Sequence, residues 1–190
     1  MANFLAGFTG TNRCKATLMN KARHILKVAI AVVEGHSLLV VRKRSSATFI
    51  LPGGKPERRE DDMEALTREV WEELGCTVRD AGLFLVGDFS DVAADHRNTT
   101  VTVRLFYGLL GGKPSPKAEI EECRWYSPLC ERDLRVAPSI SNKIVPHLLS
   151  AKLLPRISRR QSKAHFARNR TRAAHISDQV SYDIQPRFRR

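Results

Sequence analysis

The sequence predicts one α/β domain between about residues 23 and 154, with an extension at each end. Short apolar, β-branched runs bounded by turn residues predict strands, and one longer segment with helical periodicity predicts a helix. The first two runs, residues 25–33 and 37–42, are joined by Glu34-Gly35-His36 and are expected to form a β-hairpin. A chain of 190 residues has room for one domain with a proper core.

The remaining elements follow from the same signals. Further strands are expected at residues 48–51, 76–78, 83–89, 100–110 and 121–126. A closing helix is expected over residues 140–153, with Pro146 either bending it or lying near its start, because proline has no backbone N–H. No internal repeat is present, so these elements indicate a single domain.

The central helix has clear start and stop signals. Asp61 and Asp62 are typical of an N-cap and an acidic first turn, and Gly75 is typical of a helix end. An apolar stripe at three- and four-residue steps lies between them and comprises Met63, Leu66, Val70 and Leu74.

Three glutamates on this helix point to metal chemistry. Glu69, Glu72 and Glu73 are related by i, i+3 and i+4, so they lie on one adjoining face. Clustered carboxylates are unfavourable unless something positive joins them, and oxygen donors are what Mg²⁺ or Mn²⁺ prefers. The glycines of Pro52-Gly53-Gly54 let backbone approach a ligand closely. A solvated amphipathic helix is the usual alternative, and the double glycine, Glu60 and the Arg68-Glu69 pair disfavour it.

Residues 54–76 as a whole resemble the Nudix box, which reads G, five residues, E, seven residues, then REUXEEXGU with U a bulky apolar residue. Cys76 is the loosest match. The resemblance implies the Nudix fold, a mixed β-sheet sandwiched between α-helices. It also implies hydrolysis of a diphosphate linkage in a nucleoside diphosphate joined to a group X, as in a nucleoside triphosphate, ADP-ribose or a nucleotide sugar.

The resemblance assigns roles within the box. It implies that Glu69, Glu72 and Glu73 bind Mg²⁺ or Mn²⁺ together with the carbonyl of Gly53, and that Glu69 lies nearest the attacking water. Bound metal would neutralise phosphate charge and lower the pKa of that water. Arg68 is expected to orient a carboxylate through a bidentate pair. The site is further supported, by this resemblance, by Gly54, Glu60 and Gly75.

Substrate-binding residues are expected just outside the helix. Lys55 follows the double glycine and is a candidate for contact with a phosphate oxygen. Arg42 and Arg44 approach from the preceding strand. Each of these two arginines is equally consistent with a solvated charge at a strand edge.

The Nudix family often has one further carboxylate outside the box, at a variable position. Strand alternation puts Glu119 and Glu121 on one side and Glu122 on the other. We expect Glu122 to be the carboxylate near the metal. The alternative is that these residues form an acidic loop entering a strand.

Charge is concentrated at the C-terminus. Residues 151–190 hold eleven Lys or Arg and two Asp, a net of +9 out of +12 for the whole chain. Residues 155–190 have few large apolar side chains and are expected to be disordered, as is the N-terminal extension at residues 1–22. The basic tail is consistent with salt-sensitive contact with nucleic acid and equally with a solvated tail that has no partner.

Two classes of function are left open. Four cysteines without metal-ligand spacing favour reduced thiols in a cytoplasmic protein, and no apolar run reaches the length of a membrane span. An Mg²⁺-dependent pyrophosphohydrolase is favoured because no carboxylate of the box is missing. The alternative is a non-catalytic nucleotide-sensing module, with the basic tail supplying nucleic-acid contact. The oligomeric state is not predicted.

Overall fold

Two small β-sheets and two helical segments make up the part of the chain that this computed structural model describes, residues 23–95 and 98–156. The predicted extension at residues 1–22 lies outside the described residues, and so does the basic tail from residue 157 onward. Their predicted disorder therefore remains a prediction.

The first sheet contains three strands in the order β1 (Arg23–Ala31), β6 (Thr99–Gly111) and β5 (Thr77–Val92). Strands β1 and β6 are parallel along the whole of β1, whereas β5 and β6 are antiparallel. The sheet is therefore mixed. Strand β1 is an edge strand of this sheet, and the loop at Pro52-Gly53-Gly54 packs against it.

The second sheet is built around β3 (Ser37–Lys43). This strand pairs antiparallel with β2 (Val33–Glu34), β4 (Phe49–Ile50) and β7 (Ile120–Tyr126). The predicted hairpin between residues 25–33 and 37–42 is wrong for most of its length, because only β2 turns back onto β3. The chain passes from one sheet to the other at Val32, so β1 is free to pair with β6 instead.

Strand β5 also differs from expectation. Two separate strands are predicted at residues 76–78 and 83–89, and the structure has one continuous strand. Its pairing with β6 shifts register between Arg79 and Phe84 and again between Leu85 and Gly87. These irregularities account for the gap between the two predicted strands, because extra residues in a β-bulge have no partner and interrupt the alternation of side chains.

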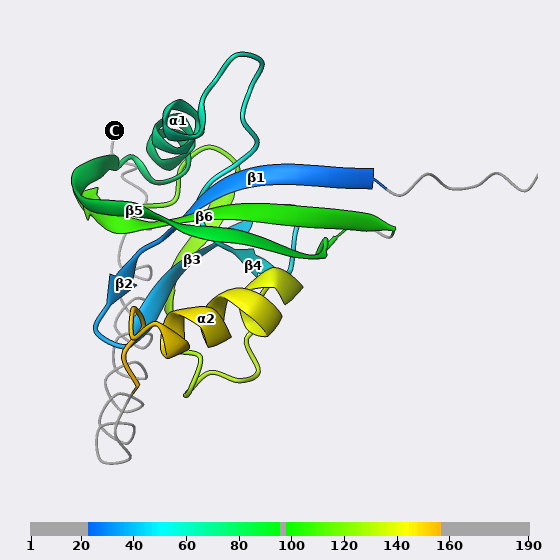
Figure 1. Cartoon of the computed structure of the whole chain (residues 1–190), viewed down its shortest axis with the longest axis vertical. Coiled ribbons are helices and arrows are strands. Elements are labelled where there is room, and N and C mark those ends of the chain that lie inside the picture. The colour runs from blue at the N-terminus through cyan, green and yellow to red at the C-terminus, as the bar shows by residue number, and fades with distance from the viewer. Residues whose placement is uncertain (1–22, 96–97, 157–190) are drawn as a thin grey trace, which may run out of the picture.

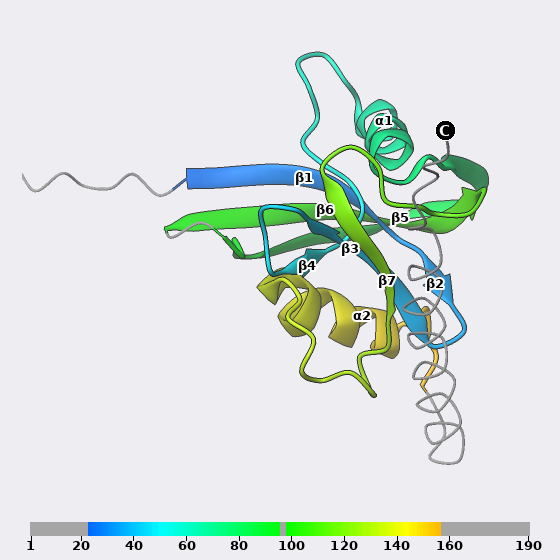
Figure 2. The ribbon, with the colours of Figure 1, turned by 180° about the vertical axis from the view of Figure 1, so that it is seen from behind.

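The strands lie between two helical layers. Helix α1 (Asp62–Leu74) lies on one side, and the π-helical turn η1 (Ile140–Ile144) with helix α2 (Val145–Ser150) lies on the other, as Figures 1 and 2 show from opposite sides. The expected arrangement, a mixed sheet sandwiched between helices, is thus confirmed. Pro146 lies in the first turn of α2, consistent with the predicted position near a helix start.

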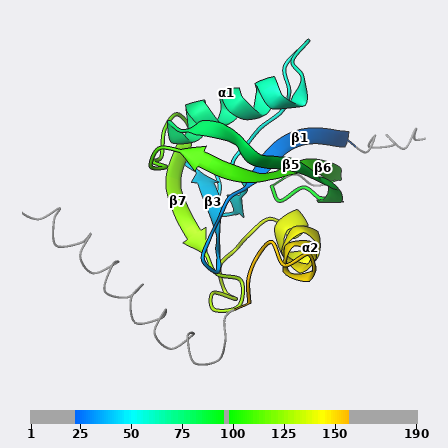
Figure 3. The same ribbon diagram turned by 60° about the vertical axis from the view of Figure 1, so that its left-hand side comes forward.

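Alternating side chains divide the core into two clusters. On β1, Val28 and Ile30 pack towards α1 with Leu66 and Leu74, whereas Ala29 and Ala31 pack towards η1 and α2. The view in Figure 3 shows α1 and α2 held apart by the strands. Successive residues of β1 therefore pack against opposite helical layers, so β1 lies between α1 on one side and η1 with α2 on the other.

Two further observations bear on the sequence expectations. Within residues 23–95 and 98–156, no helix is long and apolar enough to span a membrane. In the same ranges Cys76, Cys123 and Cys130 are free thiols, and Cys76 is buried beneath the end of α1.

Candidate active site

Helix α1 begins and ends where its sequence predicts. The Asp61 carboxylate accepts hydrogen bonds from the backbone N–H groups of Met63 and Glu64, both at 2.8 Å. The Glu64 carboxylate in turn accepts a hydrogen bond from the backbone N–H of Asp61, which completes a capping box. Gly75 ends the helix in the left-handed conformation, with φ of 65°. These caps set the register in which the glutamates leave the helix.

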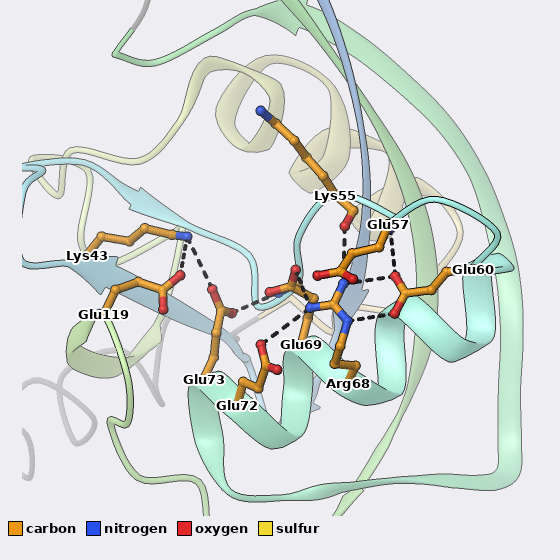
Figure 4. Close-up of polar contacts among 10 residues, drawn as sticks. Lys43, Lys55, Glu57, Glu60, Arg68, Glu69, Glu72, Glu73 and Glu119 are labelled. Carbon is orange, nitrogen blue, oxygen red and sulfur yellow. Dashed lines mark hydrogen bonds and ion pairs between the residues drawn. The ribbon is translucent and has the colours of Figure 1, made fainter.

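Arg68 is the centre of an ion-pair network on this helix (Figure 4). Its guanidinium contacts both oxygens of Glu60, at 2.6 and 2.9 Å, and reaches Glu69 at 3.0 Å and Glu72 at 3.3 Å. The hydrogen bonds from Arg68 hold the pKa of Glu60 down, to about 2. Glu60 is the carboxylate that Arg68 contacts through both oxygens.

Glu73 lies on the buried side of α1 and not at the surface. Its side chain is 1% exposed, and one oxygen, Oε2, accepts the backbone N–H of Gly53 at 3.0 Å. The other oxygen, Oε1, is 3.6 Å from the ammonium of Lys43 and has no hydrogen-bond partner among the described residues. Burial raises the pKa of Glu73 to about 7, against the opposing effects of the Gly53 hydrogen bond and the Lys43 charge.

The glycine loop brings backbone against both β1 and α1. Val28 and Ile30 donate backbone hydrogen bonds to the carbonyls of Gly54 and Pro52, at 2.9 and 3.1 Å. Gly53 has φ of 133°, and a Cβ there would lie 2.2 Å from the Val28 carbonyl oxygen. A Cβ on Gly54 would lie 2.0 Å from Oε1 of Glu69. A side chain at Gly53 would therefore meet fixed backbone, whereas a side chain at Gly54 would meet the flexible end of Glu69.

The carboxylate from the β7 region is Glu119 and not Glu122. Glu119 accepts a hydrogen bond from Lys43 at 2.7 Å, and that same lysine faces Glu73. Glu122 pairs with Arg42 at 3.1 Å, and Glu121 pairs with it too, at 2.7 Å. The predicted alternation is therefore wrong here. The pairing of β3 and β7 shifts between Arg42 and Lys43, which disturbs the two-residue period.

Of the three predicted phosphate-binding residues, Lys55 lines the pocket described below, and Arg42 and Arg44 do not. Arg42 is engaged by Glu121 and Glu122, outside the pocket described below. Arg44 is exposed and lines no part of that pocket. Lys55 does line it, and Figure 4 shows its side chain pointing away from the carboxylates while its carbonyl faces Arg68.

A pocket of about 580 Å³ opens beside the carboxylates, between β1, β6 and η1. The charged side chains at its lining are Glu69, Asp95, Glu119 and three lysines, Lys27, Lys43 and Lys55. The rest is largely aliphatic, with the side chains of Ile25, Val101, Val103, Ile140 and Ile144. Lys27 was not anticipated from the sequence, where it stands between two apolar residues of a predicted strand.

The donor chemistry of this cluster suits a divalent cation. Carboxylate and carbonyl oxygens are hard donors of the kind that Mg²⁺ and Mn²⁺ bind, and Oε1 of Glu73 is a buried oxygen with no hydrogen bond to satisfy it. As placed in residues 23–95 and 98–156, no three acidic, histidine or cysteine side chains converge in a metal-holding arrangement. Arg68 contacts the carboxylates of Glu60, Glu69 and Glu72.

Comparisons with known proteins agree on one family. The family model described as the NUDIX domain matches residues 23–146. A Mycobacterium tuberculosis protein named "Putative 8-oxo-dGTP diphosphatase 2" is 40% identical over 93 residues, covering 46% of this chain and 62% of that protein. The chain thus spans less than two thirds of the length of this curated relative.

Solved structures show the same fold. A NUDIX hydrolase from Nitrosomonas europaea matches with a TM-score of 0.56 and 22% identity, covering 68% of this chain and 91% of that one. A MutT protein from Methanosarcina mazei Go1 matches with a TM-score of 0.55 and 22% identity, covering 70% and 98%.

Proposed function

Because the chain belongs to the NUDIX domain family, whose model matches residues 23–146, we propose that it is a divalent-metal-dependent pyrophosphohydrolase. Its proposed substrate is a nucleoside diphosphate joined to a further group, such as a nucleoside triphosphate, ADP-ribose or a nucleotide sugar. One observation carries the proposal. Glu69, Glu119 and three lysines line one pocket that is large enough for a nucleotide.

The carboxylates would hold the metal. Glu69, Glu72 and Glu73, with the Gly53 carbonyl, are the proposed ligands for Mg²⁺ or Mn²⁺, and Glu119, just before β7, shares Lys43 with Glu73. Bound metal supplies charge neutralisation on the phosphates and a more acidic attacking water. Glu69 lines the pocket and is the proposed proton acceptor for that water.

The surrounding residues position these groups. Arg68 fixes Glu60 and restrains Glu69 and Glu72, and the Gly53 N–H fixes one oxygen of Glu73. The aliphatic walls of the pocket exclude water from the part of the substrate beyond the phosphates. The family relative from Mycobacterium tuberculosis makes oxidised guanine nucleotides the first substrates to try.

A hydrolysis screen tests the proposal. The panel contains canonical and oxidised nucleoside triphosphates, ADP-ribose, nucleotide sugars and capped RNA, each with Mg²⁺ and with EDTA. Metal-dependent turnover should fall at least about 100-fold in Glu69→Gln and Glu73→Gln. Glu34→Gln, which removes an exposed charge from β2, should keep wild-type turnover.

The opposite results are equally informative. Full activity of both site variants at saturating Mg²⁺ would show that these carboxylates do not carry the reaction. Nucleotide binding without turnover of any compound would reject the enzyme and favour the nucleotide-sensing alternative.

A further inference from the structure

Lys27 is a charged residue in an apolar row. Ile25, Lys27 and Ala29 lie at alternate positions of β1 and all line the pocket. On the parallel partner strand, Val101 and Val103 face Ile25 and Lys27 in register and line the same pocket. Every other member of this row is aliphatic. A charge that breaks the local pattern inside a pocket is a mark of function more than of folding.

The ammonium of Lys27 has no close counter-charge of its own. Among the described residues it forms no ion pair, whereas Lys43 is paired with Glu119 and lies near Glu73. Burial lowers the pKa of Lys27, and so do the charges of Lys43 and Lys55, against the opposing effects of Glu73 and Glu69. Lys27 shares the lining of the pocket with Lys43, Glu69 and Glu119. A half-buried, unpaired ammonium is unfavourable until an anion joins it.

We propose that Lys27 binds the terminal phosphate of the substrate and makes the pocket selective for a triphosphate chain over a diphosphate capped at both ends. This inference rests on the proposed function, because it names the substrate class of the same site. A terminal phosphate carries up to two negative charges, whereas each phosphate of a doubly capped diphosphate carries one. Lys27, Lys43 and Lys55 all line this pocket, and their positive charges match the more highly charged chain.

The competing explanation is that Lys27 is only a counter-ion for Glu69 and Glu73. The two explanations differ in what its removal does. Loss of a counter-ion would strengthen metal binding and leave affinity for phosphate unchanged. Loss of a phosphate-binding residue would weaken phosphate affinity, and an arginine would restore most of it because it also donates charged hydrogen bonds.

Calorimetry on the full chain in Mg²⁺ separates these cases without needing turnover. The probes are inorganic tripolyphosphate and ADP-ribose, and the variants are Lys27→Met, Lys27→Arg and Lys113→Met, an exposed lysine outside the pocket. Lys27→Met should raise the Kd for tripolyphosphate at least about tenfold. It should change the Kd for ADP-ribose less than about threefold. Lys27→Arg should recover most of the loss, and Lys113→Met should have no effect.

Several results would overturn the inference. These are an unchanged Kd for tripolyphosphate in Lys27→Met, equal losses for both probes, or no tripolyphosphate binding by a folded wild-type protein. Mn²⁺ titration of Lys27→Met is the companion measurement, since tighter Mn²⁺ binding with unchanged phosphate affinity identifies a counter-ion. If tripolyphosphate binding depends on Lys27 while the hydrolysis screen is silent, the phosphate site stands and the proposed enzymatic activity fails.

Discussion

Arg68 and Glu60 are joined at two points, with Nε of the arginine 2.6 Å from one carboxylate oxygen and Nη2 2.9 Å from the other. The third nitrogen of the same guanidinium reaches Glu69 and Glu72. One planar cation therefore organises three carboxylates of the candidate site. Glu60 is held by the backbone as well, through the N–H of Glu57 at 2.7 Å.

Arg68→Lys should preserve the fold and impair the site. A lysine keeps the charge but has one nitrogen, so it cannot bind Glu60 by both oxygens and still reach Glu69. We expect kcat/KM to fall about tenfold or more, equivalent to about 1.4 kcal/mol, while circular dichroism stays unchanged. Arg58→Lys, in the exposed loop before the helix, is the matched control. Undiminished kcat/KM in Arg68→Lys would mean that charge alone suffices.

Alanine at the two adjacent glycines should have different effects. At Gly54 the three atoms nearest the new Cβ all belong to the Glu69 carboxyl group, so Gly54→Ala should lower activity and leave the melting temperature nearly unchanged. At Gly53 it would meet the Val28 backbone at a φ of 133°, so Gly53→Ala should lower the melting temperature as well. Thermal melts beside kcat/KM measurements test both. Equal melting temperatures for the two variants would contradict this view of the loop.

The stability of the protein in EDTA should fall as pH rises from about 4.5 to about 7. The pKa of Glu73 is about 7 in the folded chain and 4.5 as the ordinary value of a glutamate, so the folded state binds the proton more tightly. The stabilisation is complete below pH 4.5 and is lost as pH rises through 7. Its full size is on the order of 3 kcal/mol.

Urea unfolding of Glu73→Gln at a series of pH values isolates this effect. The amide cannot ionise, so the free energy of unfolding of the variant should decline less than that of the wild-type protein between pH 5 and 8. Glu34→Gln should follow the wild-type curve, because Glu34 is exposed. If the free energies of unfolding of the wild-type protein and of Glu73→Gln changed with pH in parallel, a group other than Glu73 would be responsible for the pH dependence.

Leu66→Ala should destabilise the domain without touching the chemistry. Leu66 is fully buried between α1 and the strands, so its truncation should lower the free energy of unfolding by roughly 2–5 kcal/mol. Trp71 lies on the same helix but is 57% exposed, with the Lys117 ammonium over its ring. Trp71→Ala should cost less than about 1 kcal/mol by the same urea measurement. A larger loss for Trp71→Ala than for Leu66→Ala would reverse the assignment of the buried face.

Helix α1 could be predicted because the residues that determine it are close together in the sequence. Its caps, its apolar stripe and the spacing of its glutamates all lie within one short segment, and each is found where the sequence indicates. The burial of Glu73 was also within reach. It follows Leu66 by seven residues and so lies on the same buried face of the helix.

Pairing between distant strands was harder to foresee. Glu119 joins the site in place of Glu122 because of a register shift between β3 and β7, which no nearby residue pattern encodes. Lys27 faces a pocket because its strand pairs with β6 and not with the next strand along the chain. Such contacts depend on the whole topology.

The parallel pairing of β1 with β6 also sets an order of assembly during synthesis. Val28 anchors the Gly54 loop, yet its strand has its partner only after residues Thr99–Gly111 have left the ribosome. Helix α1 is made in between, and an isolated helix of 13 residues is marginal in water. Residues 54–76 are therefore synthesised before β1 has its partner strand, so a nascent chain that ends before β6 would carry the whole motif without the completed sheet beside it.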